Sequence, residues 1–253
     1  MRIVVEDLAV RYGRHEVLTS LDFHAEPGSV TALVGPNGCG KTTLLKAIAG
    51  TVAHSGSIRF GDHRQRPREA IGFMPQDTGT RAALTVFEVV LLGRLSRLGM
   101  TVGEHDLAAA DRALRDVGMI EHAERWISDL SGGQRQLVHF AQVLAREPKV
   151  LLLDEPTSAL DLRNQLVLLS IIGAQSRARG LTTVVTLHDL NAATRFADTI
   201  AVLHGGRLHR HGASASTIDA GVLADVWRVE AAISAAGDGM PSIVPVRAVG
   251  RVA

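Results

Sequence analysis

Short runs of apolar residues recur along the chain, and segments with a helical spacing of apolar positions separate them. Runs of this length suit parallel strands that are covered on both faces of a sheet. We interpret five of them as buried strands: residues 3–5, 30–34, 150–153, 183–187 and 199–203.

Four of the intervening segments have the pattern of helices. Residues 41–49 follow a glycine-rich turn, and residues 107–117 and 134–146 each place apolar side chains on one stripe. Residues 164–179 form the fourth predicted helix, which Gly180 is well placed to end. Because strands and helices alternate, we predict an α/β fold with a mostly parallel sheet and helices on both faces.

The same pattern divides a single domain, residues 1–253, into regions. Residues 86–125 contain helical signals but no strong strand run, so we expect a helical subdomain inserted into an α/β core. That core comprises residues 1–85, which begin with a β region, and residues 126–212. Glycine and proline residues interrupt the tail, residues 213–253, where we expect no long element.

Composition excludes some classes of protein. Apolar residues make up 46% of the chain and charged residues 21%, as in typical globular domains. Lysine and arginine total 27 against 26 acidic residues, and aromatic residues make up 4%, which argues against a nucleic-acid-binding surface. No apolar run approaches the roughly eighteen residues of a membrane-spanning helix, so any membrane role must come through a partner. The single cysteine, Cys39, excludes an intrachain disulfide and indicates a reducing compartment.

Residues 35–42, GPNGCGKT, match the pattern G-x-x-x-x-G-K-[ST] of a phosphate-binding loop. An apolar run precedes the loop and a helical pattern follows it, so backbone N–H groups and the helix N-terminus would face phosphates. Lys41 would reach the β- and γ-phosphates, and the Thr42 hydroxyl would ligate Mg²⁺. The alternative is a glycine-rich turn with an exposed lysine. Cys39 is either a small residue that fits the loop, the interpretation we favour, or a thiol whose pKa the helix terminus and Lys41 lower.

Residues 150–155, VLLLDE, predict a buried strand that ends in two carboxylates. Ligands of open α/β sheets gather at the carboxyl ends of strands, where this pair would lie. We expect Asp154 to hold Mg²⁺ and Glu155 to orient or deprotonate a water molecule. The alternative is a strand that simply ends at a polar turn. Gln76 and His188 also follow apolar runs, but spacing alone assigns them no role.

Residues 130–134 read LSGGQ. Ser131 and Gln134 match a capping box at a helix start, which needs no ligand. However, Gly132 and Gly133 each cost about 1 kcal/mol relative to alanine inside a helix, and a cap alone does not require both. Close approach of the backbone to an anion does require small residues.

With these motifs the chain resembles the ATP-binding subunit of an ATP-binding-cassette transporter. The resemblance covers nearly the whole sequence, because the motifs occur in the order typical of that family. They are GPNGCGKTT at 35–43, Gln76, LSGGQ at 130–134, VLLLDEP at 150–156, SALD at 158–161 and His188. The resemblance implies the cassette ATPase fold, with ATP and Mg²⁺ as cofactors. It also implies a homodimer in which two subunits pack head to tail, so that LSGGQ of one covers the ATP on the phosphate loop of the other.

The resemblance assigns roles to individual residues of this chain. Tyr12 would stack on adenine, and Asp161 would communicate across the dimer. The implied catalytic residues are Glu155, His188, Lys41 and Gln76, and the implied Mg²⁺ ligands are Thr42, Gln76 and Asp154. The nucleotide would contact Tyr12, Gly35, Pro36, Asn37, Gly38, Cys39, Gly40, Lys41, Thr42 and Thr43, and across the dimer Ser131, Gly132, Gly133, Gln134 and Asp161.

Three functional classes are open to a cassette ATPase: a transporter motor, a DNA-repair or chromosome-associated ATPase, and a translation factor. The DNA class usually inserts a long coiled coil between the phosphate loop and the LSGGQ segment, which we call the signature segment. The translation class usually has two cassettes in one chain. This chain has neither feature, and its near-neutral charge weakens both classes. We therefore predict a transporter motor without a nucleic-acid partner, peripheral on the cytoplasmic face of the inner membrane.

Residues 84–94, 186–198 and 240–245 resemble the importer branch for iron chelates (siderophores), haem and cobalamin. That branch pairs the ATPase dimer with integral-membrane permease subunits and, indirectly, an extracytoplasmic substrate-binding protein. Residues 77–100 would face the permease, although apolar residues there equally suit an ordinary core. The sequence departs from the branch at residues 95–100 and at Leu137. The alternative cargoes are haem, cobalamin and zinc or manganese; we interpret His204, His209 and His211 as solvated edge residues rather than metal ligands.

Overall fold

The computed structural model describes residues 1–63, 66–76, 83–94, 102–158, 160–237 and 239–250. A six-stranded sheet with the order β5-β6-β7-β3-β8-β9 lies at its centre. The first five strands are parallel, and β9 pairs antiparallel with β8 at one edge. In sheet order the strands are β5 (Ile71–Met74), β6 (Val150–Leu153), β7 (Thr182–Thr186), β3 (Val30–Val34), β8 (Thr199–His204) and β9 (Arg207–Ala213).

Four of the five predicted strands lie in this sheet, as β3, β6, β7 and β8, with bounds within one residue of those predicted. Every residue of β3, β6 and β7 is buried. Burial on both faces explains why these strands read as continuous apolar runs. The prediction of a mostly parallel sheet is confirmed.

The remaining predicted strand, residues 3–5, lies in a different sheet and is not parallel. It begins β1 (Ile3–Tyr12), which pairs antiparallel with β2 (His15–Ala25) and with β4 (Ser55–Phe60). Buried and exposed side chains are interspersed along these strands. Because this sheet buries only part of its surface, β2 and β4 lack continuous apolar runs and the sequence pattern missed them.

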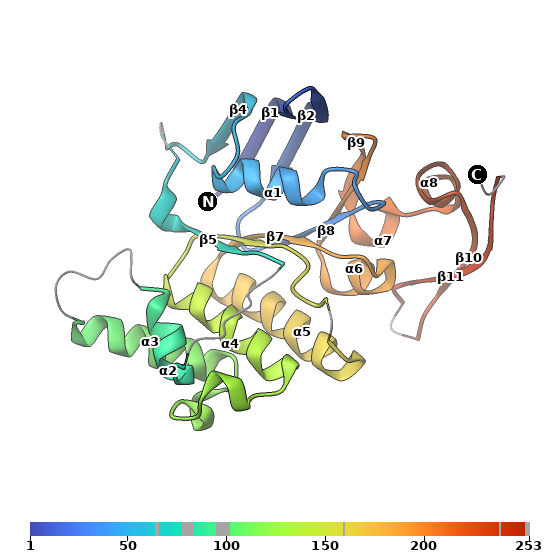
Figure 1. Ribbon diagram of the computed structural model, residues 1–253. Coiled ribbons are helices and arrows are strands. Elements are labelled where there is room, and N and C mark those ends of the chain that lie inside the picture. Colours follow the sequence, from blue (N-terminus) through green and yellow to red (C-terminus); the bar gives the residue numbers. More distant parts are fainter. Residues whose placement is uncertain (64–65, 77–82, 95–101, 159, 238, 251–253) are drawn as a thin grey trace.

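Helices cover both faces of the central sheet (Figure 1). The helix α1 lies between the two sheets, where its Leu44 and Ile48 share one core with Leu33. On the opposite face, α4, α5 and α6 contribute to a second core with Ala32 and Val185. The predicted helices are all present and begin up to three residues earlier than expected: α1 (Lys41–Ala49), α3 (Glu104–Asp116), α4 (Gly132–Ala145) and α5 (Leu162–Arg179), to which the structure adds α6 (Leu190–Phe196).

The helices α2 (Val86–Leu92) and α3 pack against α4 and form a layer beneath the sheet (Figure 1). The buried guanidinium of Arg94, two residues after the end of α2, connects the helices of this layer. It donates to Asp106 at 2.9 Å and to Glu147 at 3.0 Å, on either side of α4 in the sequence. The helix α4 therefore belongs to this layer, although it lies beyond residue 125.

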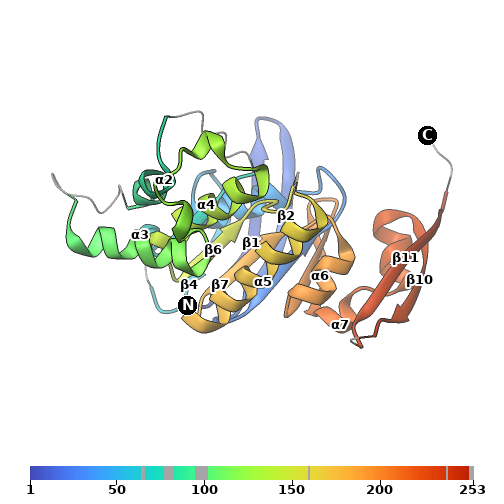
Figure 2. The same cartoon turned by 90° about the horizontal axis from the view of Figure 1, so that it is seen from below.

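The C-terminal tail is more regular than the sequence analysis expected. The strands β10 (Val229–Ala235) and β11 (Pro241–Ala248) form an antiparallel hairpin that stands apart from the central sheet in Figure 2. Asn191 of α6 forms two hydrogen bonds with the backbone of Ile243 in this hairpin. Its side-chain oxygen accepts from the Ile243 N–H at 2.7 Å, and its side-chain NH₂ donates to the Ile243 carbonyl at 3.1 Å. Pro241 begins its strand and Pro245 lies beside a register shift, positions where a proline does not break a sheet.

Short elements complete the described chain. They are the 3₁₀ turns Arg68–Ala70, Ile120–His122 and Ile127–Asp129, the helices α7 (Ser214–Thr217) and α8 (Ala220–Val222), and the π-helical turn Leu223–Trp227. Among the described residues, no helix has both the length and the apolar character that crossing a membrane requires.

Candidate functional site

The phosphate-binding loop connects β3 to α1, which is the strand–loop–helix context that the motif requires. Its last glycine, Gly40, precedes the helix with a φ of 108°, a conformation that L side chains rarely adopt. A Cβ at this position would also lie 2.5 Å from a methyl group of Leu18 on β2. Both the backbone conformation and the packing beneath it therefore demand glycine.

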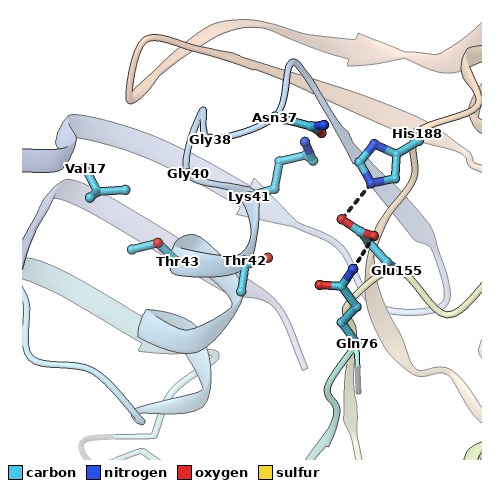
Figure 3. A pocket seen from close by; sticks show the side chains of 10 residues that line it. All are labelled: Val17, Asn37, Gly38, Gly40, Lys41, Thr42, Thr43, Gln76, Glu155 and His188. Atoms are coloured by element: carbon cyan, nitrogen blue, oxygen red, sulfur yellow. Dashed lines mark hydrogen bonds and ion pairs between the residues drawn. The ribbon is translucent and has the colours of Figure 1, made fainter. Parts of the chain in front are cut away.

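A pocket of about 530 Å³ opens beside this loop (Figure 3). One wall is the loop with the first turn of α1, and Val17 of β2 closes one end. The other wall comes from residues that follow β5, β6 and β7, three neighbouring parallel strands. The lining residues are Val17, Asn37, Gly38, Gly40, Lys41, Thr42, Thr43, Gln76, Glu155 and His188.

Lys41 is 6% exposed, and its ammonium group donates to two backbone carbonyls of the loop, Gly35 at 2.8 Å and Pro36 at 3.1 Å. In the part of the chain that the structure describes, no carboxylate pairs with it. A buried cation without an opposite charge is costly. The site therefore fits an anion that reaches Lys41 through the pocket.

Asp154 is 2% exposed at the end of β6 and accepts hydrogen bonds from two hydroxyl groups. Thr42 of α1 and Thr186 of β7 both donate to its Oδ1 atom at 3.0 Å. A carboxylate beside a threonine hydroxyl is an all-oxygen donor set, which suits Mg²⁺. The structure thus brings together two of the three predicted metal ligands.

Glu155 is held from both sides (Figure 3). The Gln76 amide donates to its Oε2 atom at 2.8 Å, and Nε2 of His188 lies 2.6 Å from its Oε1 atom. Its backbone is in the left-handed region, with a φ of 47°. Non-glycine residues adopt this conformation at a cost of about 1–3 kcal/mol, and such residues cluster at functional sites. The three residues that follow β5, β6 and β7 thus form one group, in which Gln76 donates a hydrogen bond to Glu155 and His188 lies in ion-pair distance of it.

Sequence reasoning missed two residues of the site. Thr186 accepts from the backbone N–H of Glu155 at 2.6 Å while its hydroxyl donates to Asp154, so it holds the Asp154 carboxylate and the Glu155 backbone together. Its signal was available: it is a hydroxyl-bearing residue at the end of a buried strand, two residues before His188. Val17 lines the pocket from β2, a strand that the apolar pattern did not reveal.

Tyr12 ends β1 at the tip of the β1–β2 hairpin and is 49% exposed. It is not among the residues that line the pocket, whereas Val17 of the same hairpin is. Stacking of Tyr12 on adenine stays a prediction.

Cys39 of the phosphate loop is buried, and burial raises the pKa of its thiol. Lys41 opposes this change, but its effect is smaller than that of burial. The alternative that the loop lowers the thiol pKa is therefore wrong, because removal from water outweighs the nearby cation. Cys39 acts as the small residue that fits the loop, as favoured.

The LSGGQ segment begins α4 and forms the predicted capping box. The Ser131 side chain accepts from the Gln134 N–H at 3.3 Å, and the Gln134 side chain accepts from the Ser131 N–H at 3.0 Å. The two glycines differ in their surroundings. A Cβ on Gly133 would lie 2.6 Å from side-chain atoms of Asn164, whereas a Cβ on Gly132 would meet nothing within 4 Å. Internal packing therefore explains Gly133, and Gly132 keeps an open surface.

The predicted residues outside the LSGGQ segment fall into two groups. The phosphate loop and the Gln76–Glu155–His188 group line one pocket, and Asp154 contacts Thr42 of that pocket at 3.0 Å. Asp161 caps α5 and accepts from the Asn164 N–H at 2.7 Å. Neither Asp161 nor any residue of Ser131–Gln134 lines the pocket of its own chain. Residue 159 of the SALD segment lies outside the described residues.

The histidines of β9 are not all solvated edge residues. His211 stacks on Phe23 with ring centroids 5.5 Å apart and lies 4.6 Å from the ring of His24. Burial, with a smaller effect of His24, lowers its pKa. His204 and His209 are 6.3 Å apart. Across the described ranges, no group of three histidine, cysteine or acidic residues has a metal-binding arrangement.

Of the predicted permease-facing segment, residues 77–82 and 95–100 lie outside the described residues. In the described part, Val86, Val89 and Val90 of α2 belong to the core, and Leu92 is 38% exposed. The ordinary-core interpretation therefore holds for these three valines.

The family model described as ABC transporter matches residues 18–158. A hemin import ATP-binding protein, HmuV, of Chelativorans sp. (strain BNC1) is 37% identical, covering 96% of this chain and 98% of that protein. An iron(3+)-hydroxamate import ATP-binding protein, FhuC, of Bacillus subtilis (strain 168) is 34% identical, covering 90% and 88%. The solved inward-facing structure of a metal-chelate type ABC transporter matches with a TM-score of 0.86 at 30% identity, covering 97% of each chain.

Proposed function

Because this chain belongs to the ABC transporter family of ATP-binding subunits, we propose that it hydrolyses ATP to drive import of an iron chelate through separate permease subunits. The ATPase activity is that of the family. The observation that carries it here is the Glu155 carboxylate, held between Gln76 and His188 beside a phosphate-binding loop.

The loop fits ATP as its ligand. Lys41 is a buried cation whose only acceptors among the described residues are loop carbonyls, so a phosphate oxygen can replace them. Backbone N–H groups at the start of α1 add a favourable dipole for anions. We expect Asn37, Gly38 and Gly40 to lie against the phosphates, since they line the same pocket.

The oxygen donors of the site fit Mg²⁺. Thr42 and Asp154 already contact each other at 3.0 Å, and we propose that they hold the ion together, with Gln76 as the third ligand. When bound, ATP supplies the phosphoryl group that is cleaved, and the ion neutralises phosphate charge. Thr186 keeps Asp154 oriented through its own hydroxyl hydrogen bond.

Glu155 is the residue that we assign to proton transfer. Its carboxylate faces the pocket, and a water molecule in the pocket can donate to it. His188 lies against Oε1 and Gln76 donates to Oε2, so the carboxylate cannot rotate freely. Holding a general base in one orientation raises the fraction of encounters that are productive.

We further propose that two copies pack head to tail, with Ser131–Gln134 of one over the pocket of the other. Two observations support this. The N-terminus of α4 carries an open glycine surface at Gly132 and has no acidic residue in its first turn. This anion-attracting end does not line the pocket of its own chain, so a phosphate contact would come from a second copy.

Relatives that import hemin and iron(3+)-hydroxamate support an iron chelate as the cargo, as does the similarity to a metal-chelate type transporter. Haem is also a candidate iron-chelate cargo, because the hemin relative is 37% identical to this chain and the hydroxamate relative 34%. We infer integral-membrane permease subunits, an extracytoplasmic binding protein as an indirect partner, and a peripheral position on the cytoplasmic face of the inner membrane. Residues 77–100, of which the structure describes 83–94, would form part of the surface that faces the permease.

The cargo is tested by uptake in the native host with Glu155→Gln replacing the wild-type chain and the exposed Glu69→Gln as the matched control. Labelled ferric hydroxamate, haem, cobalamin and zinc are offered in turn. We expect Glu155→Gln to abolish uptake of ferric hydroxamate alone, while Glu69→Gln transports normally. Selective loss of haem uptake would make haem the cargo, and unchanged uptake of all four would refute the import proposal.

The head-to-tail arrangement is tested by mixing two inactive chains. Lys41→Ala disables the pocket but keeps the signature, and Ser131→Arg disables the signature but keeps the pocket. Mixed dimers contain one site with both intact halves, so ATP hydrolysis should return in the mixture although each variant alone is inactive. A mixture as inactive as its components would refute the shared site.

A further inference from the structure

Asn164 holds both oxygens of the Asp161 carboxylate. Its backbone N–H donates to Oδ1 at 2.7 Å, which is the usual capping bond at the start of α5. Its side-chain amide donates to Oδ2 at 2.9 Å. Capping the start of α5 needs only the first of these bonds, so the second is not required to cap the helix.

The same side chain lies against the signature segment of the neighbouring helix. A Cβ on Gly133 would lie 2.6 Å from Cγ and Nδ2 of Asn164 and 3.1 Å from its Cβ. Asn164 therefore occupies the space that a side chain at Gly133 would fill. One amide thus contacts the carboxylate that begins α5 and the backbone that begins α4.

A second contact joins the same two regions. Gln136, one turn into α4, donates to the Pro156 carbonyl at 2.7 Å, directly after Glu155. Gln165 donates to the Leu160 carbonyl at 3.0 Å at the other end of that loop. The start of α4 and the described part of the loop from Glu155 to Asp161 are therefore held to one another by side-chain amides.

We propose that Asn164 is a positioning residue that fixes the Asp161 carboxylate relative to the Gly133 backbone, so that both reach the partner subunit as one preformed surface. The proposal rests on the head-to-tail dimer proposed above, in which each of these segments faces the other copy. Ordering a surface before association removes part of the entropic cost of binding, so the contact acts on dimer formation. Asn164 does not line the pocket of its own chain, so nucleotide binding by a single chain should not depend on it.

The experiment uses the full chain with Glu155→Gln, so that bound ATP persists. The variants Asn164→Ala, Asp161→Ala and their double are added to this parent, with Gln175→Ala as the control. Gln175 is an amide on α5 about three turns beyond Asn164, so its truncation tests general effects on the helix. Three quantities are measured: the ATP Kd of the isolated chain, the Kd of the ATP-dependent dimer by ultracentrifugation, and amide hydrogen exchange of residues 131–136 without ATP.

We expect Asn164→Ala to leave the ATP Kd within about twofold and to raise the dimer Kd about tenfold, because the preformed surface is lost. It should also speed exchange at residues 131–136, on a different helix from the substitution. The double variant should have a smaller dimerisation defect than the product of the two single defects, because both substitutions break the same contact between Asn164 and Asp161. Gln175→Ala should match the parent in all three measurements.

Two dimerisation results would overturn the positioning role but not the dimer: a parent-like dimer Kd for Asn164→Ala, or a double variant whose defect is the product of the single defects. Unchanged hydrogen exchange at residues 131–136 would also overturn it, because the contact with Gly133 would then have no effect on that backbone. Failure of the parent to dimerise with ATP would refute the head-to-tail arrangement itself, and the positioning role with it.

Discussion

The two glycines of the signature segment should respond oppositely to alanine. Neither has a positive φ, so alanine fits the backbone at both positions. At Gly132 the new Cβ meets nothing within 4 Å, and helix propensity favours alanine by up to about 1 kcal/mol. At Gly133 the same gain is opposed by a Cβ that lies 2.6 Å from Asn164, an overlap of the kind that costs about 1–3 kcal/mol. Gly133→Ala should thus lower the free energy of unfolding by as much as about 2 kcal/mol.

For a chain of this size, 1 kcal/mol changes Tm by about 2–4 °C. Gly132→Ala should therefore raise the Tm of the nucleotide-free chain by up to about 4 °C, and Gly133→Ala should lower it by up to about 8 °C. The dimer should respond differently. If the open surface of Gly132 receives the phosphate bound to the partner, its methyl group should weaken ATP-dependent dimerisation at least tenfold while the isolated chain is stabilised.

Thermal unfolding without nucleotide and ultracentrifugation with ATP, both in the Glu155→Gln background, measure the two effects. Adding Asn164→Ala to Gly133→Ala should recover part of the lost Tm, since it removes the two atoms at 2.6 Å. A lower Tm for Gly132→Ala would refute the assignment of open space at that position. A stabilised Gly132→Ala chain that dimerises normally would refute the contact between Gly132 and the partner's nucleotide.

Three further outcomes test the site and the core. Thr186→Val removes a hydrogen-bond partner of both Asp154 and the Glu155 N–H. It should reduce kcat for ATP at least tenfold with little change in KM, and should lower the free energy of unfolding by about 2 kcal/mol. Steady-state kinetics and urea unfolding measure these two effects. Burial raises the pKa of the Cys39 thiol. A thiol reagent at neutral pH should therefore modify the folded chain far more slowly than the urea-unfolded chain, with or without ATP. Rapid labelling that ATP slows would contradict this. Burial lowers the pKa of His139 from 6.5, so below that pH the unfolded chain binds a proton that the folded chain excludes. The free energy of unfolding should therefore fall as the pH is lowered below about 6.5, and His139→Gln should reduce that fall; an equal fall in both proteins would exclude His139 as a cause.

The fold could be predicted where burial is complete and not where it is partial. The strands β3, β6 and β7 are buried along their whole length, and their apolar runs identified them. The strand β4 buries only Phe60, and β10 is rich in exposed alanine, so neither has a pattern distinct from a loop. The hairpin of β10 and β11 depends on Asn191 of α6, a contact between distant segments that local patterns do not contain.

The site could be predicted as a set of strand ends but not as a set of contacts. Gln76, Glu155 and His188 follow neighbouring parallel strands, so the fold alone brings them to one edge of the sheet. The contacts among these three side chains depend on side-chain conformations that no spacing encodes. The thiol pKa of Cys39 shows the same limit, because the depth of burial outweighs the charge of Lys41 and only the structure gives that depth.

The arrangement also bears on why a chain with a complete phosphate loop carries a second anion-attracting helix end. Among the described residues no carboxylate pairs with Lys41, although Glu155 lines the same pocket, and the residues that line that pocket include none from the start of α4. The capping box satisfies the Ser131 and Gln134 N–H groups internally. A Cβ at Gly132, however, would meet no atom within 4 Å, so the surface there stays open. In the head-to-tail dimer proposed above, the pocket of one copy and the uncovered helix end of the other would complement each other. Closing one copy on another would therefore require nucleotide at the interface, and hydrolysis at Glu155 would remove the phosphate that holds the two copies together.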